Sequence, residues 1–121
     1  MTIKSKTIHD GEIAIIEVRG SLTGDEETDQ FREEVADFLE QGNRSLIIDL
    51  QRVNYMNSLG LGAIISAHAS FKKINGEIKL VGVSKNIQNL FTITRLISIF
   101  DVQESVDEAV ESFLLKNTKP I

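Results

Sequence analysis

The sequence predicts a single α/β domain, and three observations lead to this prediction. Its length of 121 residues is typical of one domain. Short apolar runs of strand length alternate with segments whose apolar residues recur at helical spacing. The only proline is Pro120, and no stretch rich in glycine, serine and proline marks a linker. We therefore expect one domain over residues 1–121, with its core at about 3–115 and a short tail at 116–121.

Two strands are expected at the start of the chain. A weak strand at Ile3–Ile8 is followed by Asp10-Gly11, which is a turn signal, and then by the apolar segment Ile13–Val18. The two strands should pair as a hairpin or an edge meander. Gly20 is expected to close the second strand.

A helix and a buried strand are expected next. Apolar residues recur at i, i+4, i+7 and i+8, which is typical of a helix with one buried stripe (Phe31, Val35, Phe38 and Leu39). Gly42 stands where a helix commonly ends. The nearly continuous apolar run Leu46–Leu50 is typical of a strand covered on both faces.

The middle of the chain repeats this alternation. We expect a helix from Ser58 to about Ile74, ended by Asn75-Gly76, and then a buried strand around Ile78–Val83. Strand–helix–strand units of this kind are almost always right-handed crossovers between parallel strands. The sequence therefore predicts a parallel central sheet.

The last third predicts two further helices with a strand between them. Ser84 can cap a third helix, and the apolar run Ile97–Phe100 is expected to be the last strand. Ser105 and Glu108 match the S-x-x-E capping box at the start of a final amphipathic helix.

Composition excludes several classes of function. Lysine and arginine number 13 against 18 acids, a net charge of −5, which disfavours binding to a nucleic-acid phosphate backbone. The absence of cysteine excludes disulfides, thiolate metal sites and cysteine nucleophiles. No apolar run has the length of a signal peptide or of a membrane span. We expect a cytoplasmic protein that contacts neither membrane nor nucleic acid directly.

No catalytic, metal or cofactor site is expected. His9 and His68 are the only histidines, and no acid–histidine spacing suggests a metal site or a proton relay. We interpret His68 as a packing residue. The segment Gly60-Leu61-Gly62 resembles the start of a dinucleotide fingerprint, but Ile65 occupies the third glycine position. We therefore predict that the chain is not an enzyme.

The segment Asn57–Gly62 is unusual for the start of a helix. Each of its two glycines costs about 0.8–1.0 kcal/mol of helix stability relative to alanine. Either the glycines let the helix pack closely against a neighbouring element, or they leave room for another molecule to approach the backbone. Ser58 likewise has two interpretations, a helix N-cap or a functional hydroxyl. Composition and spacing leave both pairs of alternatives open.

The same segment carries a family resemblance. Asn57-Ser58-Leu59-Gly60-Leu61-Gly62 resembles the Asp-Ser-[Ser/Thr]-Gly-Leu-Gly signature of the STAS family (sulfate transporter and anti-sigma factor antagonist). The flanking segments Arg19–Leu22, Ile48–Leu50 and Gly76–Leu80 agree with it in order and spacing. The resemblance covers nearly the whole chain. It implies a compact α/β domain with a mixed four- to five-stranded sheet and flanking helices.

The resemblance also implies a function. Stand-alone family members of this length are typically bacterial anti-sigma factor antagonists, which bind an anti-sigma factor that is also a serine kinase. That kinase phosphorylates the serine matching Ser58 and ends the interaction, and a PP2C-type phosphatase restores it. The residues that the resemblance assigns to partner binding are Thr23, Asn57, Ser58, Leu59, Gly60, Leu61 and Gly62.

The helix N-terminus is suited to such a switch. A phosphate on Ser58 would add about −1.5 to −2 charges. The helix dipole and the free backbone N–H groups expected at Leu59, Gly60 and Leu61 would favour that anion.

Three positions depart from the family pattern. Asn57 replaces an acid, Leu59 replaces a hydroxyl residue, and Thr23 stands where antagonists often carry an acid. These departures keep two alternatives open: a non-switching scaffold or sensor partner in a stressosome-like assembly, and, more weakly, a small-ligand-binding domain related to transporters.

The negative charge is concentrated in one segment. Residues 25–40 hold eight acids against one arginine, a net charge of −7, so the remaining chain is +2. Such a run is usually a solvated helix face, and it could also steer a basic partner.

Overall fold

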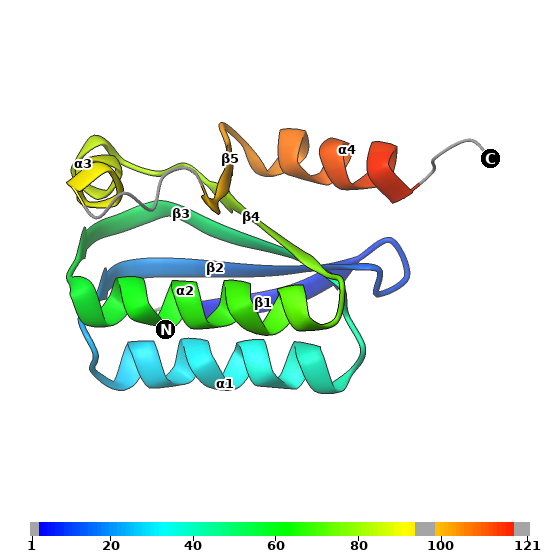
Figure 1. The fold of residues 1–121 in the computed structure, drawn as a ribbon, viewed down its shortest axis with the longest axis horizontal. Helices are drawn as coiled ribbons and strands as arrows, with labels where there is room; N and C mark the ends of the chain where they lie inside the picture. Colours follow the sequence, from blue (N-terminus) through cyan, green and yellow to red (C-terminus); the bar gives the residue numbers. More distant parts are fainter. Residues whose placement is uncertain (1–2, 94–98, 118–121) are drawn as a thin grey trace.

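The described residues form an α/β domain in which strands and helices alternate. The computed structural model describes residues 3–93 and 99–117. Their elements in chain order are β1 (Ile3–Ile8), β2 (Ile13–Leu22), α1 (Glu26–Glu40), β3 (Ser45–Met56), α2 (Ser58–Lys73), β4 (Glu77–Val81), α3 (Lys85–Ile93), β5 (Asp101–Gln103) and α4 (Val106–Asn117) (Figure 1). The predicted fold class is confirmed.

The sheet is mixed and follows the chain order β1-β2-β3-β4-β5. β1 pairs antiparallel with β2, and the other three pairings are parallel. This confirms the predicted hairpin and the predicted parallel crossovers. Because β2, β3 and β4 run in the same direction, their carboxyl ends meet at one edge of the sheet.

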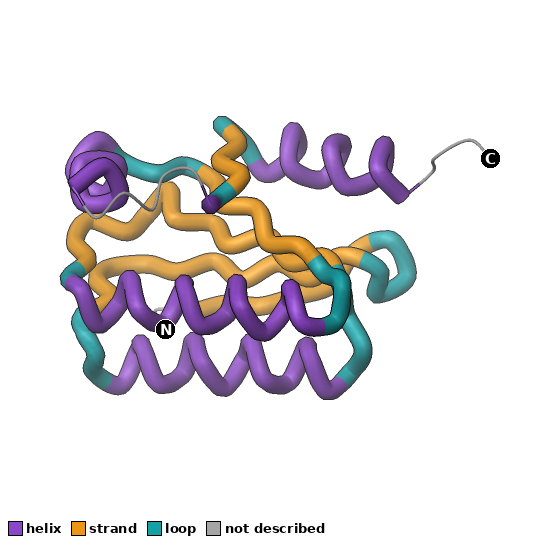
Figure 2. Tube along the Cα trace, viewed as in Figure 1, coloured by secondary structure: helices purple, strands orange, loops and turns teal. Residues whose placement is uncertain are grey.

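The helices cover both faces of the sheet. α1 and α2 lie side by side over one face, and α4 covers the other (Figure 2). The larger core lies beneath α1 and α2 and includes Phe31 and Phe71. A smaller core beneath α4 includes Ile47 and Phe113. α3 also contributes Phe91 to the larger core.

Several predicted helix boundaries are confirmed by their capping contacts. Gly42 follows the C-cap of α1 with a φ of +87°, a left-handed conformation that glycine adopts without strain. The Ser84 hydroxyl accepts a hydrogen bond from the backbone N–H of Ile87 at 3.3 Å. The Ser105 hydroxyl accepts one from the backbone N–H of Glu108 at 3.1 Å.

Two predicted strand ends are wrong. β2 continues past Gly20 to Leu22, because Gly20 takes a φ of +94° and the register with β3 shifts there, as in a β-bulge. β4 ends at Val81, so Val83 lies beyond the strand. The extension of β2 matters for function, since it brings the β2–α1 loop to the same edge as the end of β3.

The described part of the predicted last strand, residues 99 and 100, is not a strand. Residues 97 and 98 lie outside the described residues, and Phe100 packs in the core instead, stacked on Phe91 with ring centroids 5.4 Å apart. The strand β5 follows at Asp101–Gln103 and pairs with β4.

A buried lysine ties β5 to its neighbours. The Lys79 ammonium is paired with the carboxylates of Glu77 and Asp101, and it lies 4.8 Å from the centre of the Phe113 ring. Although desolvation opposes the charge, the hydrogen bonds that the ammonium donates to Asp101 and Glu77 raise the pKa of Lys79. The ion pairs thus compensate for burying a charge next to α4.

Candidate functional site

The STAS-like segment and the loop after β2 lie together at the carboxyl edge of the parallel strands. We call this region the junction edge: the β2–α1 loop at Thr23–Asp25 and the β3–α2 junction at Asn57–Gly62 (Figure 1). The side-chain amide of Asn57 donates a hydrogen bond to the Thr23 carbonyl oxygen at 3.2 Å. The backbone N–H of Asn57 donates to the Leu22 carbonyl oxygen, also at 3.2 Å. The structure therefore brings Thr23 beside the motif from 34 residues away.

Asn57, and not Ser58, caps helix α2. Its side-chain Oδ1 accepts hydrogen bonds from the backbone N–H groups of Leu59 at 3.0 Å and Gly60 at 3.1 Å. The Leu61 N–H donates to the Asn57 carbonyl oxygen at 3.0 Å. The interpretation of Ser58 as the N-cap is wrong, because Asn57 already satisfies the free donors. The expectation that these three N–H groups are free to bind a phosphate is wrong for the same reason.

Ser58 is the first helical residue of α2, and it is exposed. Among the described residues, no side-chain hydrogen bond to its hydroxyl is found. The first turn of α2 contains no acidic residue, so the positive end of the helix dipole is not neutralised from within the helix. The hydroxyl is therefore open to a second protein, and an anion attached to it would lie in a favourable field.

The two motif glycines have different roles. A Cβ added at Gly60 would lie 2.7 Å from the Leu22 Cβ and closer still to the Leu22 carbonyl oxygen. A Cβ added at Gly62 would meet nothing within 4 Å. Gly60 therefore allows α2 to pack closely on the end of β2. This is the first of the two alternatives that the sequence left open for the glycines. Gly62 is left without a packing reason.

Leu59 lies against the β2–α1 loop and still exposes 60% of its surface. Its neighbour is Gly24, where an added Cβ would lie 2.6 Å from the Leu59 Cδ1. Gly24 has a φ of +91°, so a side chain there would be strained as well. Sequence reasoning did not single out Gly24, although a glycine directly after a strand is a recognisable turn signal.

The start of α1, which adjoins the junction edge, is rich in acidic residues. The first turn of α1 holds Glu26, Glu27 and Asp29, directly after the N-cap Asp25. The Thr23 hydroxyl donates to an Asp25 carboxylate oxygen at 3.0 Å, which fixes the loop. The predicted acidic face is therefore present and adjoins the motif.

His68 is a half-buried packing residue, as predicted. Its ring contacts Phe100 edge-on, with centroids 5.4 Å apart, and its Nδ1 is buried without a hydrogen-bond partner among the described residues. Desolvation, together with the nearby Lys72 ammonium, lowers the pKa of His68 below its ordinary value. Within residues 3–93 and 99–117, no three acidic or histidine side chains are grouped so as to hold a metal ion.

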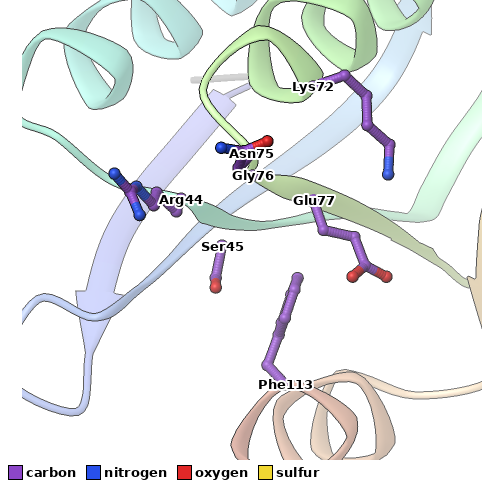
Figure 3. A pocket seen from close by; sticks show the side chains of 7 residues that line it. All are labelled: Arg44, Ser45, Lys72, Asn75, Gly76, Glu77 and Phe113. Carbon is purple, nitrogen blue, oxygen red and sulfur yellow. The ribbon is translucent and has the colours of Figure 1, made fainter. Parts of the chain in front are cut away.

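A polar cavity lies at the opposite end of the parallel strands from Ser58. It has a volume of about 400 Å³ and is lined by Arg44, Ser45, Lys72, Asn75, Gly76, Glu77 and Phe113 (Figure 3). Arg44 directly precedes β3 and Lys72 lies in the last turn of α2, at the ends of these elements that are away from the motif. This polar cavity is separate from the junction edge.

Comparison with protein families agrees with the motif and the fold. The STAS domain family matches residues 4–109, which is most of the chain. The chain belongs to the STAS domain family. No described helix of this STAS domain is long and apolar enough to cross a membrane.

Individual relatives are regulatory proteins by name. The anti-sigma-B factor antagonist of Bacillus subtilis is 36% identical over 80 residues, which cover 66% of this STAS domain and 72% of that protein. The solved structure of the anti-sigma factor antagonist SpoIIAA in its unphosphorylated form matches with a TM-score of 0.74 and 17% identity, over 93% of this chain and 96% of that chain. A variant of RsbS from Moorella thermoacetica matches with a TM-score of 0.84 and 12% identity, over 98% and 100%. The two structures share the fold with this STAS domain.

Proposed function

We propose that this STAS domain is an anti-sigma factor antagonist. It binds an anti-sigma factor that is also a serine kinase, and phosphate on Ser58 ends the interaction. The observation that carries this proposal is the exposed Ser58 hydroxyl at the start of α2, held on a rigid base by Asn57 and Gly60. The name of the Bacillus subtilis relative supports the antagonist role. A SpoIIAA structure in a phosphorylated form, which shares this fold, supports the modification.

The phosphate on Ser58 acts by weakening partner binding, and it leaves the domain folded. A phosphoserine at the start of α2 adds about −1.5 to −2 charges where the helix dipole favours an anion, so the domain stays folded. The same charge in a protein interface must lose its water. A penalty of about 4 kcal/mol would weaken binding roughly a thousandfold.

Asn57 affects where a phosphate on Ser58 can lie. An acid at this position would repel the phosphate, whereas the neutral amide of Asn57 does not. Because its Oδ1 holds the Leu59 and Gly60 N–H groups, the phosphate stays in solvent or must displace Asn57 to reach them. Either way, the negative charge is presented outward to the partner.

This role needs no catalytic residues in the STAS domain itself. It acts as a binding partner and as a kinase substrate, and a PP2C-type phosphatase would remove the phosphate. Since these partners are cytoplasmic enzymes, we place the protein in the cytoplasm.

A non-switching scaffold is the second candidate function. It is favoured by Leu59, which replaces a possible phosphoacceptor with an exposed apolar side chain. A scaffold should form a stable homo-oligomer in size exclusion and should bind its partners equally well with and without phosphate on Ser58.

The deciding experiment is a phosphorylation assay with the anti-sigma factor kinases encoded in the same genome. We expect one kinase to add a single phosphate to the wild-type protein and none to Ser58→Ala. Ser66→Ala is the matched control, because Ser66 is an exposed serine two turns further along α2 and its loss should leave phosphorylation unchanged. Phosphate on Ser84 or Ser105, or no transfer by any kinase, would contradict the proposal.

A further inference from the structure

A groove lies beside the phosphoacceptor, between the end of β3 and helix α3. Its volume is about 360 Å³. Its lining is uncharged: apolar side chains from both elements are joined by two asparagines from α3 (Tyr55, Met56, Ile87, Leu90, Ile93, Asn86 and Asn89). Such a groove contains no charged side chain that could bind a phosphate or a metal ion. Its chemistry fits an apolar side chain whose flanking backbone could hydrogen-bond to the asparagine amides.

Two side chains of the groove are exposed to an unusual degree. Tyr55 exposes 58% of its surface and Ile93 exposes 80%. Single exposed apolar residues are common, but a cluster rimmed by polar groups is typical of an interaction surface. Leu59 on the junction edge, three residues after Met56, is a third exposed apolar side chain.

The groove adjoins the junction edge along the chain. Met56 lines it and is followed directly by Asn57 and Ser58. α3, the end of β3 and the starts of α2 and α1 all lie at the same edge of the molecule (Figure 1). The start of α2 lies between α3 and the start of α1, where the acidic residues Asp25 and Glu26 stand (Figure 1). This edge of the molecule thus carries three features in succession. They are an acidic part formed by Asp25 and Glu26, the Ser58 hydroxyl, and the apolar groove.

We infer that the Tyr55–Ile93 groove is part of the docking surface for the anti-sigma factor kinase, and that it receives an apolar side chain of that kinase. This inference rests on the proposed function. The complementary surface of the kinase carries basic side chains facing Asp25 and Glu26, its active site near Ser58, and an apolar side chain in the groove. The acidic part steers the encounter, and the buried apolar contact slows dissociation.

This arrangement separates recognition from switching. The phosphate on Ser58 acts at the middle of the edge and leaves the groove unchanged. The groove therefore distinguishes one kinase from another, while the phosphate sets when the bound kinase is released. Specificity of this kind requires a contact that differs between partners, and an apolar pocket supplies one.

The test is a binding measurement with the kinase that phosphorylates Ser58, using isothermal titration calorimetry. We expect Ile93→Asp to weaken binding at least tenfold, because it places a charge in the apolar contact. The matched control is Leu115→Asp on α4, since Leu115 is 69% exposed and lies away from the junction edge. It should bind within twofold of wild type. Tyr55→Ala removes groove surface without adding charge and should weaken binding about fivefold or more.

Each other outcome overturns the inference in a distinguishable way. If Ile93→Asp and Tyr55→Ala bind like wild type while Ser58→Asp does not bind, the groove plays no part and the proposed function stands. If wild type binds none of the kinases, the proposed function fails and the inference with it. If sedimentation velocity shows a homodimer that Ile93→Asp dissociates, the groove serves a second copy of this chain. Equal weakening by Leu115→Asp would also contradict a specific groove contact.

Discussion

The Asn57 side chain bonds the β2–α1 loop to the start of α2: its amide donates to the Thr23 carbonyl oxygen at 3.2 Å. Its oxygen meanwhile caps the helix. One residue therefore fixes two segments of the junction edge relative to each other. An acid at this position could accept the helix N–H groups but could not donate to Thr23.

The cap predicts a measurable loss of stability. Asn57→Ala should lower the free energy of unfolding by about 1 kcal/mol, because two helix donors lose their acceptor. Asn57→Asp keeps the acceptor and should lose less. Urea unfolding monitored by circular dichroism measures both. Ser58→Ala is the control and should stay within about 0.5 kcal/mol of wild type, since Ser58 is not the cap. A larger loss for Ser58→Ala than for Asn57→Ala would reverse the assignment.

The two motif glycines should respond in opposite directions. Gly60→Ala pushes a methyl group into Leu22 and should cost about 1–3 kcal/mol of folding free energy. Gly62→Ala finds open space and should stabilise the helix by up to about 1 kcal/mol. Thermal unfolding of the two variants side by side provides the comparison. Equal destabilisation of both would mean that Gly62 has a packing role too.

A negative charge at position 58 should leave folding intact. Ser58→Asp places a carboxylate in the first turn of α2, where the helix dipole contributes about 0.3–1 kcal/mol of stabilisation. We expect its melting temperature to equal or exceed that of wild type, whereas kinase binding is lost. Calorimetric melting and a pull-down with the same protein sample test both halves. A marked drop in melting temperature would show that the charge acts on the fold.

The lowered pKa of His68 predicts that the stability of the protein depends on pH. Its pKa in the folded protein is lowered from about 6.5, so the unfolded chain binds the proton more readily. Acidification through the range just below pH 6.5 therefore destabilises the folded state, and this loss is absent above the unfolded pKa. Replacing the ring by His68→Gln should reduce the fall in urea midpoint between pH 7.5 and 5.5. A variant with the same fall as wild type would assign the effect to other groups.

Much of the fold could be predicted because its core elements have strong periodicity. The stripe of Phe31, Val35 and Phe38 indicated α1, and the continuous apolar run in β3 indicated a strand buried on both faces. The strand β5 was not predicted, because its sequence has no strong periodicity. β5 is three half-buried residues long and is defined by its pairing with β4, which local sequence does not encode.

The place of the candidate site at the junction of a strand and a helix could be predicted from its motif, but the contacts within it could not. Asparagine and serine are both good N-caps, and they are neighbours at Asn57 and Ser58. Only the backbone geometry decides which of them caps. Similarly, Gly60 and Gly62 look alike in the sequence, and the contact with Leu22 that separates them comes from a distant strand.

The close approach of Gly60 to Leu22 also affects what kind of substrate this protein can be. Many phosphoacceptor serines lie in flexible segments that an enzyme reads as a linear motif. Here the serine sits two positions before a backbone contact that leaves no room for a methyl group, so its hydroxyl cannot be drawn out without disturbing α2. An enzyme acting on Ser58 must therefore recognise a folded shape, and an excised peptide of the same sequence would be a poor substitute for the intact domain.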